Sequence, residues 1–390
     1  MRFLIGITAS LFVLGTYKGF QLGAPDFHVF HFAATLVADG RFSELYTVSP
    51  DRFLYAPGFA WILLPLALFP LKVSFFFWSV LKGALLGGML RVLYQRAGAV
   101  ATTLGVVFFA RPLLIDLRYG QINLIILSLA VIAIDYLCSP RSRRKEVAIW
   151  YLFSMSALSK LFPLTLILGT LRSRLARAGS ALGIGMVLIF PVIGVGFSGL
   201  FGLYRDWFYA LQSKGLPIDT HNQSFLAFML RIFSNQPAPS LQLGGTVHTH
   251  GFNLLAPDTS LFIGKLAILT ILTALITGVV RFSKHLSFDR AMILIALVVL
   301  PSHLIWKPYF IFSIPLLAIT FGRLLQSKQR VPLYLLLVLG VILSCTSYEF
   351  VGREWAARFD AWSLFYWVDW AAVLICARVL AQPRPSPAVS

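Results

Sequence analysis

The chain has 390 residues, of which 58% are hydrophobic and only 12% are charged. A soluble domain carries about 25% charged residues, so this composition excludes a soluble enzyme, a coiled coil, a disordered protein and a disulfide scaffold. The apolar residues form continuous runs rather than alternating with polar ones, which also excludes a transmembrane β-barrel. A polytopic helical membrane protein remains, and we expect an all-α fold.

The formal net charge is +18, from 33 Lys and Arg against 15 Asp and Glu. The basic residues occur in short clusters between apolar runs, which is typical of cytoplasmic loops that face anionic lipid. We therefore expect these basic residues to face membrane lipids rather than to bind nucleic acid. The three cysteines form no CxxC pattern, so neither a metal knuckle nor a disulfide framework is indicated.

We expect residues 1–382 to form one membrane domain of about 10–13 helices with both termini inside, followed by a disordered cytoplasmic tail at 383–390. The apolar runs that predict crossings are 3–22, 56–71, 73–94, 97–114, 121–138, 180–200, 257–280, 291–306, 308–323, 331–348 and 363–381. If every run between residues 55 and 139 crossed fully, the flanking loops would have the wrong parity. Either 56–71 or 97–114 is therefore short or re-entrant.

Residues 147–171 lie between two basic clusters but are too short for two full crossings, since each needs about 20 residues. They predict two short helices that meet near Lys160-Leu161-Phe162-Pro163 and place Lys160 within the membrane. This lysine either snorkels to water or binds an anion such as phosphate. The long path to water favours the anion.

The two large external loops, 23–55 and 201–256, are the natural place for a site. Residues 26–40 predict a short helix at the membrane surface, and Asp26 is either its N-cap or a general base that deprotonates a hydroxyl group. His28 lies close enough in sequence to tune this carboxylate. The HxxH pattern around it is a weak metal signal without Cys or Glu partners, so we expect no metal.

Polar residues that interrupt apolar runs have two interpretations. Gln121 and Asn123 must find hydrogen bonds in a membrane, either between helices or with a sugar, in which case Arg118 would bind a phosphate. His303 and Lys307 belong either to an interfacial aromatic belt with a snorkelling lysine or to a second anion contact.

Several short motifs occur in a fixed order between residues 20 and 310. They are Asp26-Phe27 after the first helix, Leu45-Tyr46, Tyr55-x-Pro57, Gly120-Gln121-Ile122-Asn123, Lys160-x-x-Pro163 and Asn222-Gln223-Ser224. In this order they resemble glycosyltransferase family 87, whose members are polytopic enzymes of the GT-C type. The resemblance implies a GT-C-like helix bundle, a polyprenyl-phosphate sugar donor, most often of mannose, and inverting transfer to a glycolipid or glycan acceptor.

The resemblance also implies roles for single residues. It implies that Asp26 is the catalytic base and that the enzyme needs no cofactor. It also implies that the protein lies in a bacterial inner membrane, with the site facing the periplasm. We expect the donor phosphate at Arg118, Lys160 and Lys307. The expected substrate-binding residues are His28, Tyr46, Tyr55, Gln121, Asn123, Asn222, Gln223 and His303.

Two other classes of protein compete with the enzyme. A transporter or flippase of lipid-linked sugars would also carry charges within the membrane, but such proteins often show internal repeats, and none is evident here. A membrane assembly factor would not need Asp26 and Lys160 together.

Overall fold

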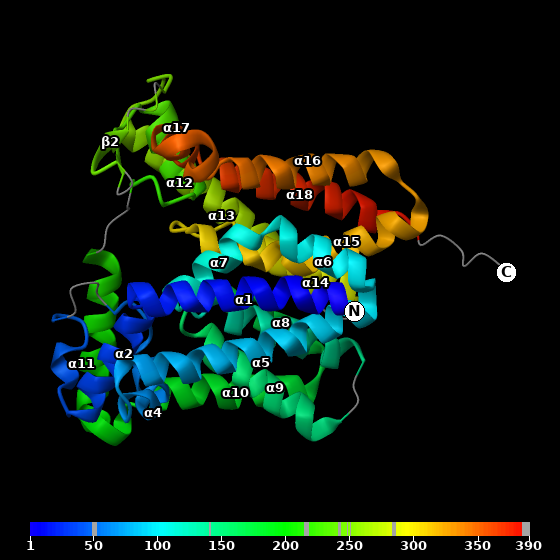
Figure 1. Cartoon of the computed structure of the whole chain (residues 1–390). Coiled ribbons are helices and arrows are strands. Elements are labelled where there is room, and N and C mark those ends of the chain that lie inside the picture. Colours follow the sequence, from blue (N-terminus) through cyan, green and yellow to red (C-terminus); the bar gives the residue numbers. More distant parts are fainter. Residues whose placement is uncertain are drawn as a thin grey trace.

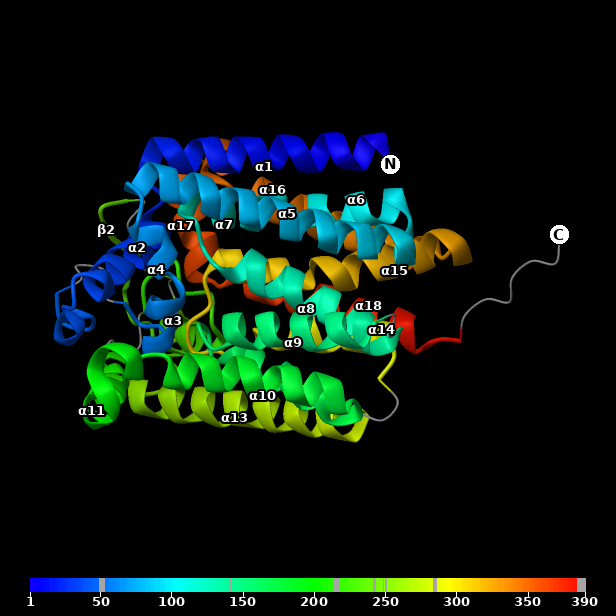
Figure 2. The ribbon, with the colours of Figure 1, turned by 90° about the horizontal axis from the view of Figure 1, so that it is seen from below.

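The computed structural model is a helical bundle, and it describes residues 1–48, 53–139, 142–213, 218–240, 243–247, 249, 251–282 and 286–383. Long helices run side by side, and shorter elements cover one end (Figure 1, Figure 2). The all-α prediction is confirmed. The predicted tail, apart from residue 383, lies outside the described residues.

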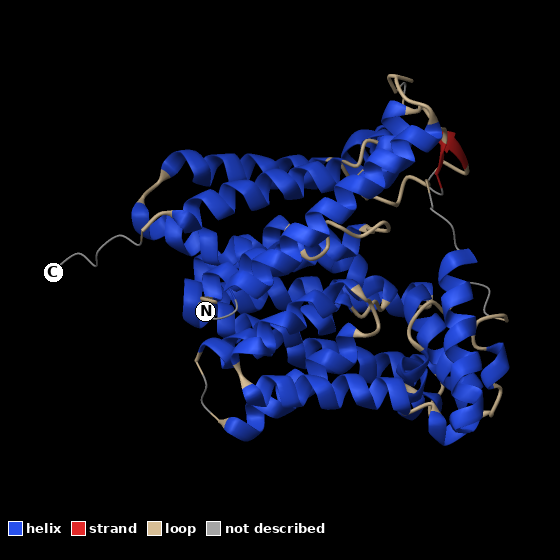
Figure 3. Ribbon diagram, turned by 180° about the vertical axis from the view of Figure 1, so that it is seen from behind, coloured by secondary structure: helices blue, strands red, loops and turns tan. Residues whose placement is uncertain are grey.

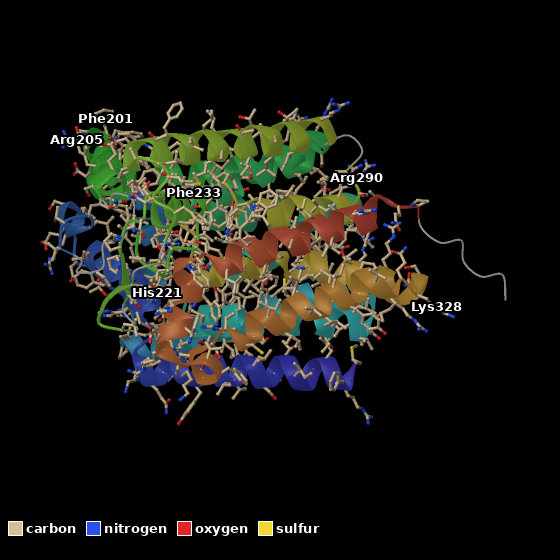
Figure 4. The ribbon with its side chains drawn as sticks, turned by 90° about the horizontal axis from the view of Figure 1, so that it is seen from above. Phe201, Arg205, His221, Phe233, Arg290 and Lys328 are labelled. Carbon is tan, nitrogen blue, oxygen red and sulfur yellow. The ribbon has the colours of Figure 1, made fainter. Side chains whose placement is uncertain are left out.

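The two ends of the bundle are distinguished by their loops. Arg290 and Lys328 lie at one end, and Phe201 and His221 lie at the other (Figure 4). The beginning of α1 and the end of α18 are both at the Arg290 end (Figure 1). We call this the inner end, because loops rich in lysine and arginine stay in the cytoplasm, and the opposite end the outer end.

The first helix, α1 (Arg2–Leu22), runs the length of the bundle. It stops at Gly23, whose φ of 76° is left-handed and therefore suits glycine. The next helix, α2 (Pro25–Ala38), begins at once, with proline at the first helical position, where its missing N–H is not needed. This turn keeps α2 at the outer end, next to the short 3-10 helix η1 (Phe42–Glu44).

The apolar run 56–71 does not cross the bundle. It forms two short helices, α3 (Pro57–Ile62) and α4 (Leu64–Ala67), and each has a proline in its first turn. Proline cannot continue a preceding helix, so the run is divided into pieces far shorter than a crossing. Of the two runs that the parity argument left open, 56–71 is therefore the short one, and the parity problem disappears.

The next helices cross in turn. They are α5 (Leu71–Ala97), α6 (Ala99–Phe108), α7 (Ala110–Tyr119) and α8 (Asn123–Cys138). The second and third meet at a bend of 67° and count as one crossing if each bent pair is a single span. The tight turn between α7 and α8 contains Gly120, whose φ is 70°.

A short hairpin follows, as predicted. It consists of α9 (Arg143–Ala157) and the 3-10 helix η2 (Phe162–Arg172), joined by a turn that carries Lys160.

Two glycines allow α10 (Arg174–Ile189) to lie directly against α9. A β-carbon at Gly179 or Gly183 would meet the carbonyl oxygen of Val147 or Tyr151, respectively. Small residues four apart permit this close approach of two helices in a membrane. α10 ends eleven residues before the predicted position, and α11 (Val192–Ser213) leaves it at a bend of 80°. The predicted loop 201–256 is therefore helical up to residue 213.

The remainder of that loop is folded over the outer end. Its elements are α12 (Phe225–Phe228), the π-helix η3 (Met229–Phe233) and the antiparallel strands β1 (Ala238–Ser240) and β2 (Gly245–Val247). Figure 3 shows the strand pair at the outer end.

The C-terminal part contributes the remaining helices. They are α13 (Pro257–Phe282), α14 (Phe288–Leu297), the 3-10 helix η5 (Lys307–Ser313), α15 (Ile314–Ser327), α16 (Arg330–Cys345), α17 (Tyr348–Ala361) and α18 (Leu364–Ala381). The run 291–306 is helical only to residue 297 and irregular beyond it.

Within the described residues, five helices are each long and apolar enough to cross a membrane, or up to eight if each of three bent pairs counts as one crossing. The chain is thus an integral membrane protein. Shorter helices, α8, α9, η2 and α14, pack among the long ones.

Candidate active site

Asp26 lies in the first turn of α2, at the outer end of the bundle. The N-cap position belongs to Ala24, so the interpretation of Asp26 as the N-cap is wrong. The carboxylate is half-buried, and its charge acts on Lys160, Tyr55 and Tyr309. Segments that are far apart in the sequence therefore place an ammonium group and two phenols within electrostatic reach of this side chain.

Lys160 is held in the turn between α9 and η2. Its Nζ atom lies 4.0 Å from the centroid of the Tyr309 ring, which is a cation–π contact. Phe162 packs against the same ring, with 5.4 Å between centroids. The aromatic pair fixes the ammonium group within the electrostatic reach of Asp26.

Two tyrosines shape the loop beside Asp26. The Tyr46 hydroxyl donates a hydrogen bond of 2.9 Å to the carbonyl oxygen of Tyr55, which fixes the chain before α3. Burial, together with the charge of Asp26, raises the pKa of the Tyr55 phenol well above its usual value. Tyr55 therefore stays protonated at neutral pH and keeps an O–H group to donate.

A buried ion pair that the sequence analysis did not identify lies in the same region. Lys82 of α5 donates to Oδ1 of Asp116 at 2.5 Å, to the Asp116 carbonyl at 3.0 Å and to the Gln121 carbonyl at 2.8 Å. Neither side chain is more than 1% exposed, and the charge of Asp116 also acts on Lys160. An ionisable residue inside an apolar run is itself a signal of function, so Lys82 and Asp116 were detectable in the sequence.

The turn before α8 brings the two predicted amides into this region. Gln121 and Asn123 are buried and hydrogen-bonded to each other. The amide of Asn123 lies against the Asp116 carboxylate. The indole N–H of Trp78 donates to the Gly120 carbonyl at 2.9 Å, which anchors the turn to α5.

Arg118 is oriented differently. Its guanidinium carbon lies 5.6 Å from the centroid of the Tyr119 ring, and its charge acts on Tyr348 in α17. The side chain is half-buried and faces the C-terminal part of the outer end.

Four other predicted residues gather around Asp360 rather than Asp26. Lys307 forms a 2.6 Å ion pair with Asp360, and both side chains are at most 7% exposed. Gln223 donates to the Asp360 carbonyl at 2.9 Å, and Asn222 donates to the His303 carbonyl at 3.2 Å. The His303 side chain is exposed and lines a groove of about 470 Å³ along α13. η5, which carries both Lys307 and Tyr309, connects this group to Lys160.

Arg231, which the sequence analysis did not assign to the site, ties this second group together. It is fully buried, and burial lowers its pKa to about 10, so it stays charged at neutral pH. Its guanidinium donates to the carbonyl oxygens of Ile218, Asp219, Asn222 and Ala361 and to the Ser363 hydroxyl.

His28 is exposed on α2. Across the described ranges of the chain, no three His, Cys, Asp or Glu side chains come together as a metal site.

The group around Asp26 combines a carboxylate, an ammonium and phenols at one end of a membrane bundle. A carboxylate can take a proton from a hydroxyl group, and an ammonium can stabilise negative charge that develops on a phosphate.

Comparison with known sequences gives one result. The family model "Glycosyltransferase family 87" matches residues 53–306, which is more than half of the chain. The matched region contains Tyr55, Arg118, Lys160 and His303, whereas Asp26 precedes it. No curated protein and no solved structure gives a significant match.

Proposed function

Because the chain belongs to glycosyltransferase family 87, we propose that it transfers mannose from a polyprenyl-phosphate donor to a hydroxyl group of a glycolipid or glycan. Family membership makes it an integral membrane glycosyltransferase rather than a transporter or an assembly factor. The proposal adds the donor, the sugar, the acceptor and the place of reaction, which is the outer face of a bacterial inner membrane.

One observation carries the proposal: Asp26 and Lys160, which are separated in the sequence by the helices α3 to α9, lie within electrostatic reach of each other at the outer end. Asp26 would remove the proton from the acceptor hydroxyl, whose oxygen attacks the anomeric carbon opposite the phosphate. The bond between that carbon and the phosphate oxygen breaks, and its electron pair stays on the phosphate. The sugar is transferred with inversion.

The leaving group is a phosphate, so it needs charge neutralisation rather than protonation. We assign this role to Lys160, a point charge of the kind that binds phosphate well. Lys307 is already paired with Asp360, and Arg118 faces Tyr348. With Lys160 in this role, we propose that transfer requires no metal ion, so EDTA should leave the rate unchanged.

Asp26→Asn tests the catalytic role. Asn keeps the shape of Asp but has no useful basicity, and loss of a general base costs about 10²–10⁴-fold in rate. The assay follows labelled mannose from polyprenyl-phosphate mannose into the glycolipid fraction, with purified protein in lipid nanodiscs.

Asp39→Asn is the matched control, because Asp39 lies at the other end of α2 and is exposed. It should transfer mannose at nearly the wild-type rate. Near-wild-type turnover of a folded Asp26→Asn protein would refute the catalytic role. Wild-type protein that binds the donor but moves no mannose would refute the proposed reaction.

A further inference from the structure

We infer that Asp116 is a further substrate contact, which recognises hydroxyl groups of the transferred sugar together with Asn123. The inference rests on the proposed sugar transfer and deepens it, because it locates the part of the site that distinguishes the sugar from its lipid carrier.

Each of the two side chains has one oxygen free to accept. Oδ1 of Asp116 is held by Lys82, and the Asn123 amide nitrogen is held by Gln121. Within the part of the chain that the structure describes, Asp116 Oδ2 and Asn123 Oδ1 have no hydrogen-bond partner of normal geometry, although the Asn123 amide group also approaches the Asp116 carboxylate. Both residues are 0% exposed, and they lie against each other at the turn between α7 and α8.

Two neighbouring buried oxygens without partners are unusual. Buried polar atoms are nearly always hydrogen-bonded, and each exception calls for an explanation such as a ligand. Lys82 gives Asp116 its counter-charge and fixes its orientation, so the carboxylate is held rigidly with one oxygen directed elsewhere. Such fixed acceptors are what a binding site requires of its contact residues.

The chemistry of the two atoms indicates the ligand. Both are acceptors, and Asp116 is negatively charged, so they would repel a phosphate but accept hydrogen bonds from sugar hydroxyls. The charge of Lys160 is within reach of both Asp26 and Asp116. A sugar bound here would have its phosphate on Lys160 and its hydroxyls on Asp116 and Asn123.

The alternative is that Lys82 and Asp116 only stabilise the fold, and a paired substitution separates the two roles. Lys82→Met/Asp116→Leu removes both charges, and Leu has the same number of side-chain heavy atoms as Asp. Replacing a whole buried ion pair by apolar residues is often neutral for stability, whereas removing one partner is costly. The matched control is Arg96→Met/Asp135→Leu, which removes the 2.6 Å ion pair between α5 and α8 at the inner end.

Two lipids serve as probes: polyprenyl-phosphate mannose and polyprenyl phosphate without a sugar. Their dissociation constants are measured by tryptophan fluorescence in nanodiscs. For Lys82→Met/Asp116→Leu we expect affinity for the mannose-bearing lipid to fall about 10–100-fold, as for loss of a hydrogen bond to a charged group. Affinity for the sugar-free lipid should stay within about two-fold of wild type, and the control should bind both as wild type does.

An unchanged affinity for the mannose-bearing lipid, or an equal loss for both lipids, overturns the inference and leaves the pair a structural role. If the paired variant does not fold, Asn123→Ala serves instead, because it keeps the ion pair. Asn123→Ala must weaken binding of the mannose-bearing lipid selectively, and an unchanged or unselective affinity of this variant overturns the inference. Wild-type protein that binds neither lipid refutes the proposed donor, and the inference with it. Wild type that binds both equally refutes sugar recognition alone.

Discussion

The close contact of α10 with α9 predicts opposite effects for two glycine-to-alanine substitutions in the same helix. A β-carbon at Gly183 would meet the Tyr151 carbonyl oxygen and lie 3.1 Å from the β-carbon of Ser154. Around Gly185, by contrast, nothing lies within 4 Å of the added atom. The two positions therefore differ in the space available, not in secondary structure.

The magnitudes follow from this difference. Each substitution removes backbone freedom from the unfolded chain and so stabilises the helix by about 0.5–1 kcal/mol. At Gly183 the new methyl group must also push the helices apart, and overpacking costs about 1–3 kcal/mol. The helical gain cancels between the variants, so Gly183→Ala should be less stable than Gly185→Ala by about 1–3 kcal/mol.

The free energy of unfolding can be measured by SDS titration in mixed micelles, with wild type, Gly183→Ala and Gly185→Ala in parallel. Gly185→Ala should equal or exceed wild type. If Gly183→Ala proves as stable as Gly185→Ala, the two backbones are not in contact at this point, and the reasoning is refuted.

Three further predictions concern charge. Lys160→Met should raise the donor KM about 10–100-fold, since one charge-assisted contact is lost; an unchanged KM in steady-state kinetics of the folded variant would remove Lys160 from the phosphate. Asp360→Asn should cost about 3–5 kcal/mol of unfolding free energy, because Lys307 stays buried without a counter-charge. Lys307→Met/Asp360→Leu should recover most of that loss in SDS titration, and an equal loss in both variants would contradict the pairing as its cause. The topology can be tested in a protein whose native cysteines are replaced. Ser142→Cys should react with an impermeant maleimide only from the inner side, and Ser213→Cys only from the outer side. Labelling of Ser142→Cys from outside would show that the assigned topology is wrong.

The crossings were predictable where apolar runs are long and free of proline. The runs 3–22 and 73–94 became α1 and α5, with ends that differ by at most three residues. The run 56–71 is equally apolar, but its prolines divide it into α3 and α4. In the run 56–71, hydrophobicity predicts burial in the membrane, but the positions of its prolines divide it into helices too short to cross.

The candidate site was predictable in part. Asp26 and Lys160 stood out as ionisable residues in or beside apolar runs, and the structure brings them together. The ion pair of Lys82 with Asp116 joins positions 34 residues apart, and no local pattern reveals such a partner. The same limit applies to Asn222, whose side chain donates to the His303 carbonyl across 81 residues.

The buried guanidinium of Arg231 has a consequence for how the protein is made. Two of its acceptors, Ala361 and Ser363, lie 130 and 132 residues further along the chain. A ribosome therefore delivers this charge long before those acceptors exist, and a buried charge without its partners is costly. Without the junction of α17 and α18, Arg231 loses these two acceptors, so we expect a chain truncated before residue 361 to be open to protease between residues 218 and 240. Protection of that segment in the truncated chain would disprove the dependence. On this reasoning we expect the outer end to stay accessible until the last helix is made, so that completion of the membrane domain also completes the site.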